Sequence, residues 1–220
     1  MSSTDPQHAP FGRVVALHDP SLEAIAWALV GALGGDTAAR LHARTSVLAQ
    51  RLDGVGSDPA LQLDALSGRV ACGFAVPRRA APDLEDLLPD RVLESRSGTA
   101  LTVALLVAVV GQRRGWDVEI VCGKAMAFVA HRRLDHPLVC SPQHDGRLID
   151  ARDVEDGDLW RMCAHEVADT LLARIAGRAR GIARHDLATR ALELSCVLPG
   201  TPQDIARRQM ALTRARSAFN

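Results

Sequence analysis

Thr99–Gln112 reads TALTVALLVAVVGQ, and this stretch decides the fold because it holds the longest apolar run of the chain, Thr99–Gly111. The run has no polar face, so a helix formed by it must be surrounded by protein on most sides. It is too short to span a bilayer, which takes about 20 apolar residues. Arg96-Ser97-Gly98 forms a tight entry directly before it. The stretch therefore predicts a buried central helix.

Short β-rich pieces, divided by Gly, Pro and Asp, follow the central helix. From Asp117 onward the hydrophobic period becomes the one typical of strands. The apolar pairs and triplets are Val118 and Ile120; Met126, Phe128 and Val129; Leu138 and Val139; Leu148 and Ile149. Four strands at hairpin spacing predict an antiparallel sheet packed on the central helix. The expected fold class is therefore α+β.

Helical patterns lie on both sides of this core. Ser21 is expected to cap a helix that Gly34-Gly35 ends. Further helices are expected over Thr37–Leu52, Pro59–Leu66, Leu84–Glu94 (broken by Pro89), Leu159–Arg178, Ile182–Leu198 and Pro202–Ala218, the last two as an αα-hairpin. Arg69–Val76 stays open between strand and loop. We expect a flexible leader (1–20), an N-terminal helical region (21–82), a core (83–160) and a C-terminal helical region (161–220).

Composition argues against several classes of protein. The chain has 47% apolar residues, which is ample for a buried core in one compact domain with an extension or in two small domains. The 26 basic and 26 acidic side chains cancel, so no global field favours nucleic acid or anionic lipid. Three tryptophans, four phenylalanines and no tyrosine leave little material for base-stacking platforms.

The cysteines and the first residues bear on the cellular compartment. Five widely spaced cysteines form no Cys-x-x-Cys pair that would indicate zinc or redox work. Met1–Pro10 is polar and lacks the basic start and apolar stretch of a secretory signal. These features predict a cytoplasmic protein without a cofactor.

A family resemblance enters at the start of the central helix. The segment LESRSGTALT, residues 93–102, resembles the Leu-Glu-Arg-Arg-Arg-Gly-Ile-Pro-Ile-Ser signature of bacterial SirB-type transglutaminase-like proteins. His185–Leu194 followed by Leu198-Pro199 resembles the tetratricopeptide-like hairpin that closes those proteins. The resemblance implies a papain-like core with a helix on an antiparallel sheet, a helical lead-in and a C-terminal αα-hairpin.

The same resemblance locates the catalytic positions of active relatives. Thiol acyl transfer needs a cysteine at the helix N-terminus and a histidine on the facing strand, oriented by a carboxylate. By this alignment Ala100 stands where active transglutaminases have cysteine, and Ala127 stands where they have histidine. Asp150 matches the strand-ending aspartate. The resemblance therefore implies a fold whose usual acyl-transfer chemistry is absent.

Other polar residues near this region offer alternative chemistry. Asp150, Thr99, Lys124 and His131 are candidates for an acid, a base or a polarising group in a repurposed pocket. Lys124, with Cys122 two residues earlier, could form a Schiff-base or anion-binding pair; the other interpretation is a solvated lysine and a small core thiol. A shift of the strand register by one or two residues would bring His131 nearer the site.

Metal and nucleic acid remain minor interpretations. His131, His136 and His144 are candidate ligands across a hairpin, but their spacing matches no zinc pattern. Arginines make the C-terminal helices locally basic, although Asp186 and Glu193 are interspersed, so a phosphate-backbone interface is not expected.

Two functions remain open from the sequence. The preferred one is a non-catalytic protein with a regulatory role, whose cleft and C-terminal hairpin bind a peptide, a protein or a small molecule. The alternative is an enzyme with a repurposed cleft between Gly98 and Asp150 that performs acyl transfer, hydrolysis or biosynthetic chemistry. The sequence gives no expectation for the oligomeric state.

Overall fold

The computed structural model describes residues 10–217 except 80, 125, 136 and 155–158. The chain divides into two compact units. Unit 1 contains the described residues up to Ala39 and those from Ala164 onward, and unit 2 contains Arg40–Cys163. The division into four consecutive segments stays a prediction. The two units are defined by contacts between residues, and unit 1 combines an early and a late part of the chain.

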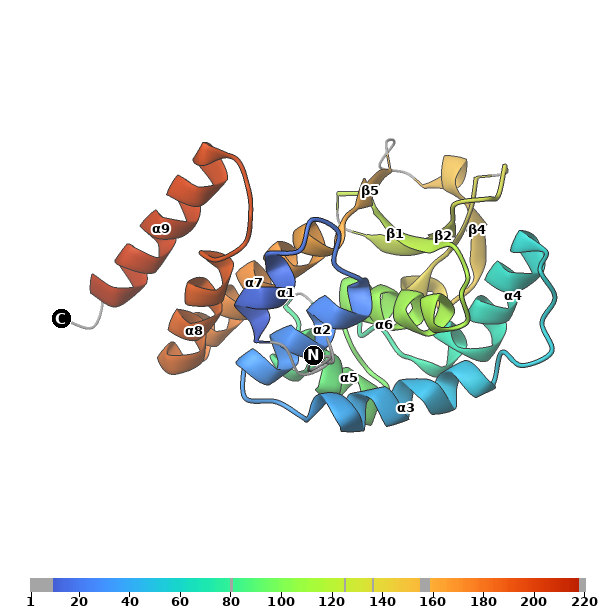
Figure 1. The fold of residues 1–220 in the computed structure, drawn as a ribbon, viewed down its shortest axis with the longest axis horizontal. Coiled ribbons are helices and arrows are strands. Elements are labelled where there is room, and N and C mark those ends of the chain that lie inside the picture. Colours follow the sequence, from blue (N-terminus) through green and yellow to red (C-terminus); the bar gives the residue numbers. More distant parts are fainter. Residues whose placement is uncertain (1–9, 80, 125, 136, 155–158, 218–220) are drawn as a thin grey trace, which may run out of the picture. The chain divides into compact units, whose positions relative to one another are not determined.

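The helices and strands have the following bounds (Figure 1). Unit 1 holds α1 (Phe11–Val15), α2 (Leu22–Ala32), α7 (Ala164–Gly181), α8 (His185–Ser195) and α9 (Pro202–Ser217). Unit 2 holds α3 (Ala38–Gln50, apart from its first two residues), α4 (Pro59–Arg69), α5 (Pro89–Ser95) and α6 (Ala100–Arg113), with strands β1 (Val118–Cys122), β2 (Ala127–His131), β3 (Leu138–Cys140), β4 (Leu148–Asp150) and β5 (Trp160–Met162). Short 3₁₀ helices are η2 (Ala71–Gly73), η3 (Glu85–Leu87), η4 (Pro142–His144) and η5 (Ala151–Asp153).

The sheet of unit 2 is antiparallel, with the strand order β4-β3-β2-β1-β5. The α+β class is therefore confirmed, but the expectation of four strands is wrong. Trp160–Met162 was expected within a helix, yet it pairs with β1 through Cys122↔Trp160 and Ile120↔Met162, and the helix starts only at Ala164. Long-range pairing decides this segment because three residues carry too little periodicity to show a strand.

Helix α6 is the centre of unit 2, as its sequence predicts. Every residue from Leu101 to Gly111 is buried. The helix lies along one face of the sheet, beside β1 and β2 (Figure 1). Gly111 allows this close approach: a Cβ there would lie 2.8 Å from Val118 Cγ2 and 3.0 Å from Leu66 Cδ1. The helix and the sheet are therefore in direct contact at this point.

The opposite face of the sheet has a smaller core of its own. Its buried members are Val121, Phe128, Val139 and Val154. Val154 follows η5, so the segment after β4 covers this face. Both faces of the sheet are thus packed.

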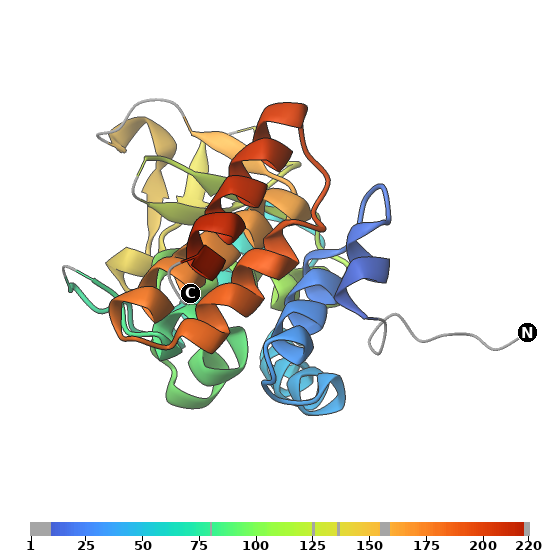
Figure 2. The same cartoon turned by 90° about the vertical axis from the view of Figure 1, so that its left-hand side faces the viewer.

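Unit 1 is helical. Helix α8 lies side by side with α7 and α9 (Figure 2). Arg208 of α9 connects all three helices: its Nε donates to Asp169 Oδ1 at 3.0 Å on α7, and its Nη1 donates to the Leu198 carbonyl at 2.9 Å after α8. The αα-hairpin expected from the sequence is therefore closed by a buried arginine, which cannot be seen in the helical period.

Several local expectations agree with the structure. The Ser21 side chain accepts a hydrogen bond from the Ala24 amide at 3.1 Å and begins α2. Pro89 stands at the first turn of α5 and separates it from η3. Arg69–Val76 forms the end of α4, η2 and an isolated bridge between Ala75 and Ser97. No helix within the described part of the chain is long and apolar enough to cross a membrane.

Candidate functional site

The start of α6 has the geometry of a nucleophile position but carries no nucleophile. Thr99 is the N-cap, and its Oγ1 accepts from the Thr102 amide at 3.3 Å and lies 2.8 Å from Thr102 Oγ1. Ala100, the first helical residue, is half-buried. A thiol placed there would face the positive end of the helix dipole. The methyl group has no such chemistry, and the Thr99 hydroxyl is occupied by capping.

Ala127 begins β2 on the sheet face that packs against α6. It pairs with Cys122 of β1, on the same face as Val118, which touches Gly111 of α6. The side chain of Ala127 is only 3% exposed, so this position offers neither a proton acceptor nor an opening to solvent. Ala100 and Ala127, which the family resemblance aligns with the cysteine and histidine of active relatives, are together called the former catalytic position below.

Asp150 does not lie beside Ala127, contrary to the expectation from the sequence. The strand register places Cys140 of β3 between Val129 of β2 and Leu148 of β4. Ala127 lies two residues before Val129 on β2. Asp150 lies two residues after Leu148 on β4, which runs parallel to β2. With about 3.3 Å per residue and 4.8 Å per strand, their Cα atoms are roughly 16 Å apart. An extra strand, β3, lies between them.

The carboxylate of Asp150 already has partners. Its Oδ1 accepts from the Arg152 amide at 2.8 Å and from Arg152 Nε at 3.0 Å. Its Oδ2 accepts from Arg152 Nη2 at 2.6 Å. Asp150 therefore caps η5 and holds an exposed arginine, which is a structural role.

Ser141 is the polar residue that the hairpin brings toward Ala127, and sequence reasoning missed it. It follows Cys140, whose partner Val129 is two residues from Ala127. Its Oγ lies 2.8 Å from His144 Nδ1, which is the kind of pair that can activate a hydroxyl. Ser141 is 0% exposed, however, so the pair stabilises a turn. The sequence did hold a signal for this residue. In an antiparallel hairpin the end of the second strand lies beside the start of the first, so the residue after β3 is expected near the start of β2.

His131 lies on the same face as Ala127 but at the other end of β2. Its Nδ1 accepts from the Arg133 amide at 3.2 Å, so its Nε2 carries the proton and donates to Gln62 Oε1 at 2.9 Å. Burial lowers the pKa of His131, Asp117 partly opposes that effect, and Arg133 adds to it. Both ring nitrogens of this buried neutral histidine are used, so it cannot serve as a base.

The remaining candidates do not converge on one site. Lys124 is an exposed residue in the turn after β1, and the Cys122 thiol lies 2.9 Å from Met162 Sδ. His144 is bound to Ser141, and His136 lies outside the described residues. Within the described ranges, no three His, Cys, Asp or Glu side chains group as metal ligands.

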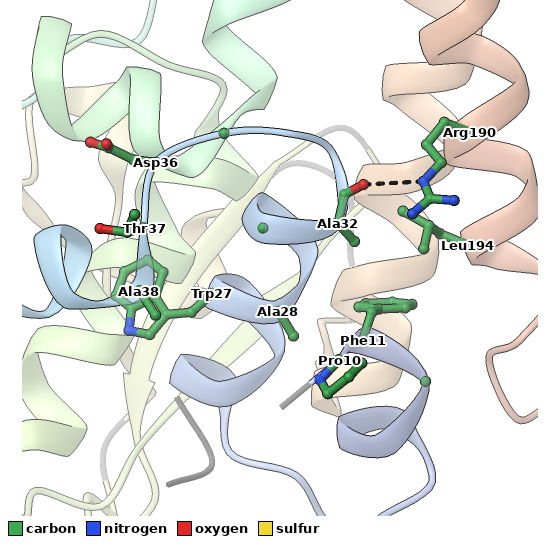
Figure 3. A pocket seen from close by; sticks show the side chains of 13 residues that line it. Pro10, Phe11, Trp27, Ala28, Ala32, Asp36, Thr37, Ala38, Arg190 and Leu194 are labelled. Atoms are coloured by element: carbon green, nitrogen blue, oxygen red, sulfur yellow. Dashed lines mark hydrogen bonds between the residues drawn. The ribbon is translucent and has the colours of Figure 1, made fainter. Parts of the chain in front are cut away.

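A cavity of about 610 Å³ opens in unit 1 (Figure 3). Sequence reasoning did not find it. It is called the unit 1 groove below, and its lining residues are Pro10, Phe11, Gly12, Trp27, Ala28, Gly31, Ala32, Gly35, Asp36, Thr37, Ala38, Arg190 and Leu194. These residues come from the start of α1, from α2 and the loop after it, and from α8. Its volume falls in the range typical of ligand sites, about 300–1,000 Å³.

The unit 1 groove is apolar with one charge at each side. Phe11, Trp27 and Ala28 form its apolar wall, while Arg190 and Asp36 lie on opposite sides of it in the view of Figure 3. Arg190 Nε donates to the Ala32 carbonyl at 3.2 Å, at the C-terminal end of α2, where the helix dipole favours a cation. The groove can therefore hold an apolar group and a neighbouring charge.

Comparison with known proteins agrees with the fold. The family model of the transglutaminase-like superfamily matches residues 36–174. A crystal structure of menin, described as revealing the binding site for Mixed Lineage Leukemia (MLL) protein, is similar in fold with a TM-score of 0.52 and 14% identity. The match covers 94% of this chain and 60% of the menin chain, so this chain spans about 60% of menin's length. No match was found among curated protein sequences.

The fold thus defines a transglutaminase-like α+β protein, with a central helix on an antiparallel sheet. Because the family model spans more than half of the sequence, the chain belongs to the transglutaminase-like superfamily.

Proposed function

We propose that this chain is a non-catalytic member of the superfamily, of the bacterial SirB-type branch, and that it binds an apolar peptide segment of a protein partner. The observation that carries the proposal is the contrast between the former catalytic position, filled by Ala100 and Ala127, and a formed groove elsewhere. All five cysteines are free, which suits a cytoplasmic location.

The lining of the unit 1 groove favours one kind of occupant. Phe11 and Trp27 line the groove with apolar carbon atoms, although only 4% and 2% of their surfaces are exposed. An apolar side chain that fills the groove displaces water from this apolar lining. Arg190 at the rim is half-exposed and forms a long ion pair with Glu193 at 3.9 Å. An apolar segment with a carboxylate at the Arg190 side is complementary to this arrangement. The description of menin as having a binding site for MLL protein supports a partner-binding role for this fold.

Two other functions have less support. An enzyme with a repurposed cleft would need Asp150, Thr99 or Lys124 to act together, but Asp150 is bound to Arg152 and Thr99 is bound to Thr102. A nucleic-acid interface would need unbalanced arginines on the C-terminal helices. Asp169 pairs with Arg207 and Arg208, and Glu193 pairs with Arg216, so these charges are largely compensated.

The test is selection of a phage-displayed heptapeptide library on the wild-type chain and on a variant with a filled groove. Gly31→Leu fills the groove without a clash, because a Cβ at Gly31 has no neighbour within 4 Å. Gly177→Leu is the matched control, since Gly177 is also an exposed helical glycine with a free Cβ position but does not line the groove.

We expect enriched peptides to combine apolar residues with an acidic residue and to bind wild type and Gly177→Leu alike. Binding to Gly31→Leu should fall at least about tenfold, the change expected from about 1.4 kcal/mol. Failure to enrich any sequence, or equal binding to Gly31→Leu, would refute the groove as the binding site.

A further inference from the structure

Arg44, Arg51 and Arg96 of unit 2 lie near the entry to α6, and one of them, Arg44, is paired with a carboxylate. Arg44 and Arg51 are seven residues apart, which is about two helical turns, in and just after α3. Arg96 is the C-cap of α5. Arg44 forms an ion pair with Glu94 at 3.9 Å. No carboxylate within the described part of the chain pairs with Arg51 or Arg96.

Arg96 is held in a fixed position. Its backbone is left-handed, with φ at 59°, its amide donates to the Val92 carbonyl at 2.9 Å, and its carbonyl accepts from the Ala75 amide at 2.8 Å. The guanidinium lies over the Phe74 ring, 5.0 Å from its centroid. The ring covers one face of the guanidinium and leaves its N–H edge for another acceptor.

Arg51 reaches the same turn of the chain. Its Nη1 lies 3.9 Å from the position of a Cβ on Gly73, the residue before Phe74. Arg69 adds a further guanidinium nearby, because its Nη1 donates to the Arg51 carbonyl at 3.2 Å. Gly73 and Phe74 are therefore flanked by Arg51 and Arg96.

The electrostatics of this cluster differ from those of other arginines in unit 2. Buried Glu119 accepts from Arg132 at 2.8 Å and from Arg161 at 2.9 Å. Asp117 lies 3.8 Å from Arg132, so two carboxylates balance the two arginines there. By contrast, burial lowers the pKa of Arg96, and the positive charges of Arg51 and Arg44 lower it further. An anion between these groups would relieve their repulsion.

We propose that Arg44, Arg51 and Arg96 bind a phosphate group, either inorganic phosphate or a small phosphate monoester. Phosphate carries close to two negative charges at pH 7 and several acceptor oxygens, and guanidinium groups bind such oxygens in pairs. A single carboxylate would neutralise less of the cluster. The site lies within unit 2 and shares no residue with the unit 1 groove.

The test is thermal unfolding of the full chain against increasing sodium phosphate, with ionic strength kept constant by NaCl. Free phosphoserine serves as the monoester probe. The variants are Arg51→Gln, which alters an exposed side chain, and Arg96→Gln. Arg147→Gln is the matched control, an exposed arginine of the same unit outside the cluster.

We expect a saturable rise of Tm in wild type and Arg147→Gln, and binding about 10- to 100-fold weaker in Arg51→Gln, since a charged hydrogen bond contributes about 1.5–3 kcal/mol. Without phosphate, Arg51→Gln should have the higher Tm because one repelling charge is gone. The proposal is overturned if phosphate acts no more strongly than NaCl, if Arg51→Gln responds like wild type, or if Arg147→Gln loses the response equally. A response to phosphoserine alone assigns the site to monoesters; a response to both probes assigns it to phosphate generally.

Discussion

The former catalytic position in unit 2 and the groove in unit 1 differ in both packing and chemistry. At the former, Ala100 and Ala127 present only methyl groups, and the neighbouring Ser141 is completely buried. At the latter, aromatic residues and a half-exposed Arg190 surround a cavity of about 610 Å³. The contrast supports the proposal that this chain keeps the framework of its superfamily and binds a partner at the unit 1 groove.

Three of the polar residues of unit 2 that the sequence offered as candidates are bound within its framework. His131 uses both ring nitrogens, Asp150 caps η5, and Thr99 caps α6. Substitutions in the packed framework of unit 2 should therefore change stability, whereas substitutions in the unit 1 groove should change peptide binding. The following predictions are ordered by their expected effect on folding.

Gly146→Val should have the largest effect. Gly146 has φ at +75°, and a Cβ there would lie 2.7 Å from the Cys72 amide nitrogen and 2.8 Å from the carbonyl carbon of Ala71. The turn after η4 would have to separate from η2, which should cost more than about 3 kcal/mol or prevent folding. Urea unfolding followed by circular dichroism measures the change.

Gly115→Val is the control for this substitution. Gly115 has φ at +73°, but its Cβ position has no neighbour within 4 Å. It should therefore show only the cost of backbone strain, about 1–3 kcal/mol. Equal destabilisation by the two variants would show that close packing at Gly146 does not fix the framework of unit 2.

His131 should make stability depend on pH. Burial lowers its pKa in the folded chain, whereas an unfolded histidine has a pKa of about 6.5. The unfolded state therefore binds more protons as pH falls below about 6.5, and the free energy of unfolding should decrease there. Urea unfolding between about pH 5 and pH 8 measures this change.

His131→Gln should reduce the pH dependence, and His144→Gln, at an exposed histidine, should retain it. Should His131→Gln keep the full dependence while His144→Gln loses it, the assignment of His131 as the buried neutral histidine would be wrong.

Arg190→Gln should have the smallest effect on folding. Its Nε donates to Ala32 and its ion pair with Glu193 is long and exposed, so the free energy of unfolding should change by less than about 1 kcal/mol. Binding of an acidic apolar peptide selected on wild type should weaken about tenfold, with loss of the preference for the acidic residue. Titration of fluorescent forms of that peptide, with and without its acidic residue, measures the affinity and the preference. An unaltered affinity would remove Arg190 from the site.

The sequence predicts local features well and long-range ones less well. The buried helix, the Ser21 cap and the first four strands follow from apolar period and capping chemistry within a few residues. Trp160–Met162 was missed because only its partners in β1 make it a strand. Asp150 was matched to the strand-ending aspartate of the family, but the strand order places β3 between its strand and β2. The groove was missed because it joins residues near Phe11 with Arg190, which only the tertiary fold brings together.

Acyl-transfer activity of the purified full chain is the most direct measurement. A fluorescent primary amine and a glutamine-containing peptide serve as substrates, with hydrolysis of an activated ester followed in parallel. Because Ala100 and Ala127 carry neither a thiol nor an imidazole, the rate should equal that of buffer alone. Turnover that persists through purification and disappears in Ser141→Ala would contradict the loss of chemistry in unit 2.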